Sequence, residues 1–91
     1  MTVQRRIVCA ANRDVSGLVI LGVRHWDAFM NAQADSQPWI AGRHEQGFID
    51  QFGVFMSRTE AWQVAAPAGQ IIRRVGGDDA DGGTLYSENL Y

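Results

Sequence analysis

Lysine is absent from the 91-residue sequence, cysteine occurs once and proline twice, and no long apolar run is present. The single cysteine, Cys9, cannot form a disulfide within the chain or build a site from several thiolates. No apolar run reaches the ~20 residues of a membrane-spanning helix, and the first residues lack the pattern of a signal peptide. We therefore expect a cytoplasmic protein that does not enter a membrane.

A strongly basic composition is absent as well. The formal net charge is −2 and the pI is about 5.5, which argues against binding to polymeric DNA or RNA. All eight basic residues are arginine, and the planar guanidinium suits phosphates and carboxylates. A GC-rich genome would give the same bias, so the arginines alone do not identify a ligand.

The length is sufficient for one domain, residues 1–91, but a chain of this size buries only about 60% of its unfolded surface. Three Trp, four Phe and two Tyr are more large apolar side chains than a small core encloses. Self-association would cover the excess, and the alternative is that several of these side chains are half-exposed. We expect a homo-oligomer.

The first quarter of the chain has the pattern of a β-hairpin. Residues 4–11 and 18–23 read as strands, and the Asn, Asp, Ser and Gly residues between them at 12–17 favour a turn. Apolar residues at both parities of the second strand imply that both faces of the sheet are covered.

A short amphipathic helix is expected at residues 25–34, with a stripe formed by Trp26, Phe29, Met30 and Gln33. Residues 35–43 contain a proline and a glycine and are expected to form a loop, which Trp39 attaches to the core.

A second hairpin and a second helix follow. Residues 47–51 and 54–56 are predicted to be strands around a turn that ends at Gly53. Ser57 and Glu60 have the spacing of a capping box, so a helix should begin there, and it should end near Pro67.

The rest of the chain is expected to contain little regular structure. Residues 70–75 read as a final strand or extended arm, and residues 76–83 as a flexible acidic surface loop. The apolar tail at residues 85–91 should dock on the body. The predicted fold class is α+β: a small antiparallel β-sheet with two short α-helices packed on it, forming homo-oligomers.

Catalytic and metal-binding patterns are missing. Cys9 lies in a predicted strand, and no Ser–His arrangement with an orienting acid is visible. Neither His25 with Asp27 nor His44 with Glu45 has the i, i+4 spacing that places two metal ligands on one helical face. We expect no catalytic residues, no metal and no cofactor.

Anion binding has better support. Arg24 and His25 follow an apolar strand and precede a helix, where side chains and helix-start amides can meet an anion. Arg73 and Arg74 form a second cationic pair, or alternatively protect the edge of a sheet. Phe48 could stack on a nucleobase, and the alternative for Phe48 is core packing.

Five segments, in the same order along the chain, resemble one phage family: Val23–Asp27, Glu45–Asp50, Arg58–Trp62, Gln70–Ile72 and Leu85–Tyr91. It is the first family of Thoeris anti-defence proteins, phage sponges for cyclic ADP-ribose signals. The similarity spans almost the whole chain and is most specific in the Glu-Gln-Gly-Phe run and in the Tyr-Ser-Glu-Asn-Leu-Tyr ending.

The resemblance implies a non-catalytic protein of the host bacterial cytoplasm. It would bind the cyclic ADP-ribose isomer that a bacterial TIR-domain protein makes, and would hold it intact so that the effector is not activated. Members of the family form homodimers, and hexamers that are trimers of dimers. Some also bind cyclic oligonucleotides at a separate site.

The resemblance and the anion-binding patterns together give a set of ligand-binding residues: Phe48, Arg73, Arg74, Arg24, His25 and Asn89. Phe48 would stack on the adenine, one arginine of the Arg73–Arg74 pair would contact the diphosphate, and the others would make polar contacts around the ribose. We expect Phe48→Ala and Arg74→Ala to abolish binding without disturbing the fold. The alternatives are a small phage enzyme that degrades a cyclic nucleotide, and an inhibitor that binds a bacterial defence protein directly.

Overall fold

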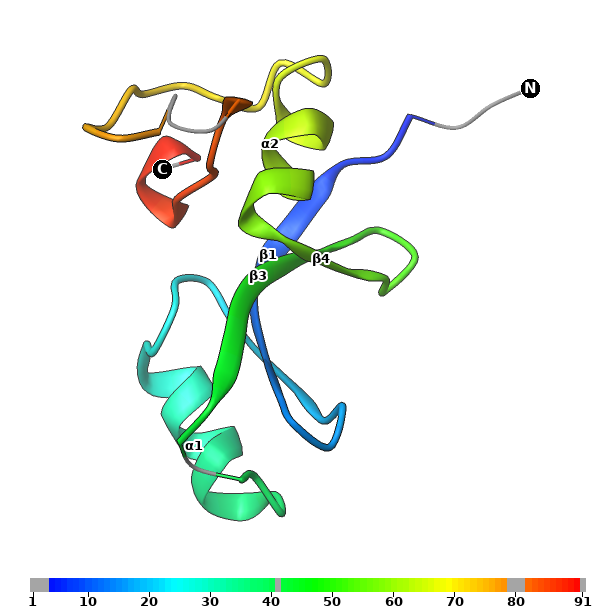
Figure 1. Ribbon diagram of the computed structural model, residues 1–91, viewed down its shortest axis with the longest axis vertical. Helices are drawn as coiled ribbons and strands as arrows, with labels where there is room; N and C mark the ends of the chain where they lie inside the picture. Colours follow the sequence, from blue (N-terminus) through cyan, green and yellow to red (C-terminus); the bar gives the residue numbers. More distant parts are fainter. Residues whose placement is uncertain (1–3, 41, 79–81, 91) are drawn as a thin grey trace.

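The computed structural model describes residues 4–40, 42–78 and 82–90 of the chain. Its centre is an antiparallel sheet in the order β2-β1-β3-β4. The strands are β1 (Ile7–Asp14), β2 (Val19–Gly22), β3 (His44–Asp50) and β4 (Phe55–Ser57). Two α-helices, α1 (Ala28–Ser36) and α2 (Arg58–Ala65), and a short 3₁₀ helix, η2 (Ser87–Asn89), complete the described elements (Figure 1). The predicted α+β class is confirmed.

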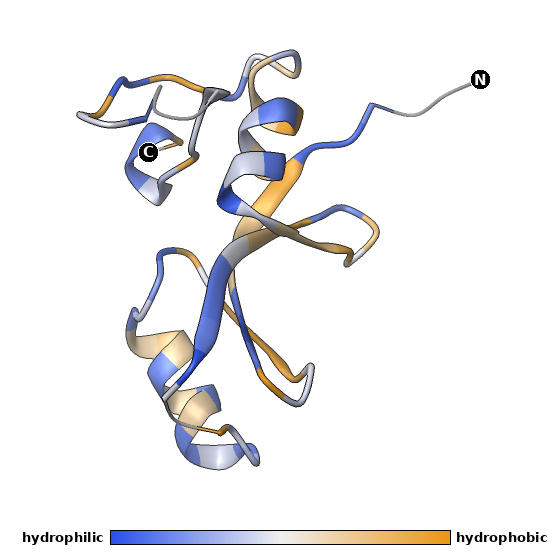
Figure 2. Ribbon diagram, in the orientation of Figure 1, coloured by the Kyte–Doolittle hydropathy of each residue, from blue (hydrophilic) through white to orange (hydrophobic). Residues whose placement is uncertain are grey.

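The core lies between the sheet and both helices. Met30 from α1 and Ala61 from α2 are fully buried in the same cluster as Ile20 and Phe48 from the strands. Leu85 from the C-terminal tail joins this cluster. Figure 2 shows how hydropathy changes along the strands: the first half of β1 is apolar, and the first half of β3 is polar.

The opposite face of the sheet, which we call the open sheet face, has no helix on it in the described part of the chain. The strand registers place five half-buried side chains on this face: Cys9, Val19, Leu21, Ile49 and Phe55. Gly47 makes the face close-packed, because a Cβ there would lie 2.0 Å from the Met56 carbonyl oxygen and 2.8 Å from the Phe55 ring. Both hairpins expected from the sequence are present.

The first strand is shifted toward the C-terminus relative to the prediction. It begins at Ile7 and continues to Asp14, because β3 pairs with it as far as Asp14 opposite His44. The turn therefore starts later, where the Asp14 carboxylate accepts hydrogen bonds from the backbone amides of Ser16 and Leu18 (2.9 and 3.0 Å).

The predicted apolar stripe of the first helix is wrong in part. Helix α1 begins at Ala28, and Asp27 caps it by accepting from the Met30 amide at 2.9 Å. Trp26 precedes the helix in the left-handed region (φ 58°), and Phe29 is exposed. Only Met30 of the helix is buried, so the spacing of the large residues overstated how much of α1 faces the core.

The capping box at the start of α2 is confirmed. The Ser57 hydroxyl accepts from the Glu60 amide, and the Glu60 carboxylate accepts from the Ser57 amide, both at 3.2 Å. The helix buries Ala61, Val64 and Ala65. This cap sets the position of Arg58, the first residue of α2.

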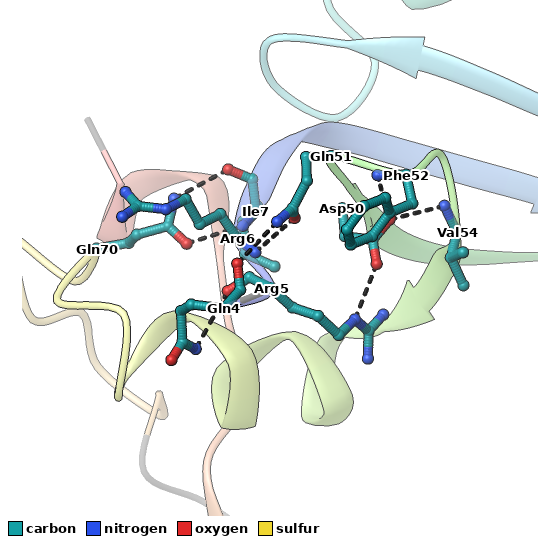
Figure 3. A network of polar contacts seen from close by, with 9 residues as sticks. All are labelled: Gln4, Arg5, Arg6, Ile7, Asp50, Gln51, Phe52, Val54 and Gln70. Carbon is teal, nitrogen blue, oxygen red and sulfur yellow. Dashed lines mark hydrogen bonds and ion pairs between the residues drawn. The ribbon is translucent and has the colours of Figure 1, made fainter. Parts of the chain in front are cut away.

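Three glutamine side chains form hydrogen bonds with backbone groups of β1, of β2 and of the residues that precede β1. The Gln70 amide pairs with both the N–H and the C=O of Ile7 (2.8 and 2.9 Å), and Gln51 accepts from the Arg6 amide and donates to the Gln4 carbonyl (Figure 3). Gln33 binds the N–H and C=O of Leu21 on the edge strand β2 in the same way. These amides extend the hydrogen bonding of the sheet beyond its last strand residues.

The segment after α2 is an extended arm without a strand, and the tail docks against it. The Asn89 carbonyl accepts from the amides of Ile72 and Arg73 (2.9 and 3.3 Å). The loop predicted at residues 76–83 is described at 76–78 and 82–83, while residues 79–81 lie outside the described residues, as does Tyr91. Asp78 in this loop is buried, whereas Gly76, Gly77 and Gly82 are exposed.

Candidate functional site

The docked tail brings His25, Arg58 and Ser87 together. The His25 Nε2–H donates to the Gly47 carbonyl at 2.7 Å, and since a carbonyl can only accept, this bond fixes the tautomer. Nδ1 is then an acceptor, and the Ser87 hydroxyl (3.1 Å) and an Arg58 Nη2–H (3.4 Å) are the donors that face it. The imidazole is therefore held neutral between the sheet and the tail.

Arg58 is the unusual member of this group. Its guanidinium lies 5.1 Å from the centre of the Tyr86 ring, and its Nε–H is buried without any hydrogen-bond partner in the described part of the chain. Burial lowers the pKa of Arg58, but the group remains a cation. A second cation is close by, since Arg24 lies 3.8 Å from the Glu88 carboxylate on the tail.

A second polar cluster, around Asp78, contacts the tail at Asn89, two residues after Ser87. Arg74 donates to both Asp78 oxygens (2.8 and 2.7 Å), and the Asn89 amide donates to Asp78 Oδ2 at 3.1 Å and to the Arg73 carbonyl at 2.8 Å. The hydrogen bonds from Arg74 and from the Val75 amide hold the pKa of Asp78 far below its usual range. This cluster fastens the tail to the arm.

The structure divides the predicted ligand residues between these two places. Arg24 and His25 belong to the first cluster, and Arg73, Arg74 and Asn89 belong to the second. Asn89 is fully buried and its amide is used by the protein itself. Arg73 and Arg74 are exposed, and Arg74 already forms a two-point ion pair with Asp78.

Phe48 has no surface available for stacking in this conformation. It is fully buried, and its ring packs edge-on against the His25 imidazole with 5.0 Å between ring centres. The alternative expectation for Phe48, packing in the core, agrees with the structure. Phe48 contributes to the candidate site by packing against the His25 imidazole.

Sequence reasoning missed Arg58, Tyr86 and Ser87. Arg58 was read only as part of a helix start, and Tyr86 and Ser87 only as part of a docking tail. One signal was present: Arg58 follows the cap residue Ser57 directly, so its position is fixed by a local motif. What the sequence did not contain was the partner across the fold, because the tail lies about 30 residues later.

The arrangement can attract an anion but offers no evident catalytic machinery. Ser87 is buried, and its hydroxyl is hydrogen-bonded to His25. Among the described residues, no three His, Cys, Asp or Glu side chains lie close enough to hold a metal ion. In the same residues, no helix has the length and apolar character needed to cross a membrane.

Fold and site together define a small α+β domain with a cationic cluster between its second helix and its C-terminal tail. The chain belongs to the phage T4 y16D protein family, whose sequence model matches residues 6–91. The match includes both helices, the whole sheet and the docked tail. Searches of curated proteins and of solved structures give no significant match.

Proposed function

We propose that this phage protein binds a cyclic ADP-ribose isomer made by a bacterial Thoeris TIR-domain protein and holds it without degrading it. The effector that the messenger activates would then remain inactive. The observation that carries the proposal is the Arg58 guanidinium, a half-buried cation with an unused, buried N–H donor. A membership in a phage family and the residues that resemble the Thoeris anti-defence proteins support the same reading.

The unused donor favours an anionic ligand. A buried polar group without a partner costs roughly 1–3 kcal/mol, and such groups are rare enough in folded proteins to call for an explanation. A phosphate oxygen that reached the guanidinium would compensate its charge, and it would satisfy the buried Nε–H as well only after a local movement that exposes that atom. The diphosphate of a cyclic ADP-ribose isomer has this chemistry.

The surroundings of Arg58 support a nucleotide over a bare anion. The Tyr86 ring already faces one cation and, being half-buried, has a surface that a ribose or base could cover. Arg24 supplies a second positive charge beside the tail. One arginine over the Tyr86 ring and a second arginine beside the neighbouring Glu88 match a ligand that carries phosphates and a base.

Storage of the ligand fits this site better than turnover does. The Ser87 hydroxyl is buried and is hydrogen-bonded to the half-buried His25 imidazole, so the hydroxyl is not placed to attack a bound nucleotide. A sponge works by stoichiometric capture and therefore needs tight binding, and nanomolar affinity corresponds to about −12 kcal/mol. We propose that a second copy of the chain completes the enclosure of the ligand.

Capture and release of the messenger test this proposal. The protein is incubated with a cyclic ADP-ribose isomer, separated from free ligand by filtration, and heated to denature it. We expect the filtrate to lack the messenger and the heated fraction to contain it intact. A linear product would identify a degrading enzyme instead. Free passage of the messenger, with a stable complex formed with a bacterial defence protein, would identify a direct inhibitor.

Arg58→Gln tests the site separately from the activity. Glutamine retains a polar side chain but is shorter than arginine, and it loses the charge and the planar guanidinium with its several donors. We expect capture to weaken at least tenfold, the factor for loss of one charge-assisted hydrogen bond. Arg6→Gln is the matched control, since the Arg6 side chain is exposed and only its backbone amide is used. Equal capture by both variants would exclude Arg58 as the ligand contact.

A further inference from the structure

The β1–β2 turn and the start of β3 lie at the end of the sheet away from the C-terminal tail (Figure 1). A hollow lies between them. Its volume is about 540 Å³, which is within the range of small-molecule sites. The lining residues are Arg13, Asp14, Val15, Ser16, Gly17, Arg43, His44 and Glu45. None of them takes part in the Arg58 cluster.

The frame of this hollow is fixed by the Asp14 carboxylate. One oxygen accepts from the Ser16 hydroxyl and from two backbone amides of the turn, and the other accepts from the Ile40 amide at 2.9 Å. The Ser16 hydroxyl bond, partly offset by desolvation, holds the pKa of Asp14 below its usual value. Asp14 is therefore ionised, and the hydrogen bonds that occupy its oxygens come from neutral donors within the protein, so its charge remains in the wall of the hollow.

The other charges of the hollow are unevenly compensated. Arg13 and Glu45 lie opposite each other on β1 and β3 and form an ion pair at 2.7 Å, and the Arg13 guanidinium also packs 4.4 Å from the centre of the Phe55 ring. Arg43 has no carboxylate within 4 Å in the described part of the chain. Arg43 is thus the arginine of the hollow that forms no ion pair with the described residues.

His44 offers a second unused group. Its Nδ1–H donates to the Gly42 carbonyl at 3.1 Å, which leaves Nε2 of the neutral ring as an acceptor. The ring makes an edge-on contact with Trp26 and a tilted contact with Trp39, at 5.3 and 5.9 Å between ring centres. The two indoles also contact each other, so the position of His44 is set by a packed aromatic group.

We propose that this hollow is a second ligand site, which takes a small hydroxylated anion with a phosphate or carboxylate group. Arg43 contacts the anionic group, and His44 Nε2 accepts a hydrogen bond from a neighbouring hydroxyl. The rigid turn and the Arg13–Glu45 pair form the walls. The site is independent of the proposed capture of a cyclic ADP-ribose isomer, because it shares no residue with the Arg58 cluster.

Amide NMR spectra recorded during titration test this inference. The probes are glycerol 3-phosphate and lactate as hydroxylated anions, and inorganic phosphate and acetate as matched anions with no neighbouring alcohol, all at constant ionic strength. We expect saturable shifts at Gly17, Gly42 and His44, with each hydroxylated probe binding more tightly than its plain counterpart. Tighter binding of the phosphates than of the carboxylates, or the reverse, identifies which anionic group the site takes.

Arg43→Gln should weaken the binding of glycerol 3-phosphate about tenfold, whereas Arg6→Gln and Arg58→Gln should leave it unchanged. All three variants keep the backbone contacts of the parent. Absence of saturable shifts at the hollow, or equal affinity of wild type and Arg43→Gln, would overturn the assignment. Because Arg43→Gln retains Arg58, it should still capture the cyclic ADP-ribose isomer, so failure of one site does not imply failure of the other.

Discussion

His25 connects the sheet to the tail through a neutral imidazole, and this makes the fold sensitive to acid. Burial lowers the pKa of His25, and the nearby Arg58 charge lowers it further, against the opposing effects of the Gly47 bond, Glu88 and Asp27. The unfolded chain, with a pKa of about 6.5 at this residue, therefore binds the proton more readily than the folded chain. By linkage, the free energy of unfolding falls as the pH drops below about 6.5 toward the lower folded value.

We predict that urea midpoints measured between about pH 7.5 and pH 5 decrease with falling pH in the wild type. His25→Gln removes the titrating group and should flatten this dependence. His44→Gln, which removes the other histidine of the chain at an exposed position, is the matched control. An unchanged slope in His25→Gln would show that the imidazole is not the source of the acid sensitivity.

Asp78 holds the tail in place, and its removal should release the tail selectively. The carboxylate accepts from Arg74, Asn89 and the Val75 amide, so Asp78→Ala leaves the Val75 N–H without its acceptor and the buried Asn89 amide with only the Arg73 carbonyl. We predict faster hydrogen exchange at residues 85–90, with β3 amides little affected. Asp35→Ala, at an exposed position on α1, is the control. Unaltered protection of the tail in Asp78→Ala would contradict this role.

At this scale the sequence could identify residue types but not their surroundings. It placed Arg24 and His25 correctly beside each other at the end of an apolar strand, and the structure adds Arg58 and the tail to them. It could not decide whether Phe48 is exposed, since an aromatic residue in a strand has the same pattern in a core and in a binding site. Phe48 is fully buried, so Phe48→Ala should lower the free energy of unfolding by about 3–5 kcal/mol. An undisturbed fold is therefore no longer expected for this variant.

At the scale of the elements, the capping box of α2 gives the clearest quantitative prediction. Ser57→Ala removes the acceptor of the Glu60 amide and should lower the free energy of unfolding by about 1 kcal/mol, as measured by urea denaturation. Thr59→Ala is the control, because Thr59 is exposed in the same turn, and its change should stay within about 0.5 kcal/mol. A cap variant as stable as wild type would mean that another group satisfies this amide.

Local signals explain which elements could be predicted. The capping box, the Asp14 turn and the hairpin around Gly53 each depend on residues within four positions of one another, and all three are present. The predicted apolar stripe of α1 is wrong in part, because Gln33 binds the edge of β2 and Phe29 is exposed. Spacing alone does not reveal which side of a helix meets the sheet. The buried Asp78 was missed because its partner Asn89 lies in the tail.

At the scale of the whole molecule, the two faces of the sheet differ in how they are covered. Both helices and the tail pack on one face, while the open sheet face keeps Cys9, Leu21 and Ile49 only half-buried. Burial raises the pKa of the Cys9 thiol, so this residue acts as an apolar group there. A small domain with one uncovered apolar face has a physical reason to associate with a second copy, and oligomerisation stays a prediction.

Sedimentation equilibrium tests this prediction. We expect a mass that is a multiple of the 10.1 kDa chain at micromolar concentrations. Val8→Glu should shift the equilibrium toward the monomer, because Val8 is 51% exposed next to Cys9 at the irregularity of β1 and a charge there would have to be desolvated in the interface. Val15→Glu, exposed in the β1–β2 turn, is the control for an added charge. If Val8→Glu associates like wild type, the copies do not meet through the open sheet face. If wild type is a monomer at every concentration, self-association does not explain the uncovered face, and the Arg58 site must enclose its ligand within one chain.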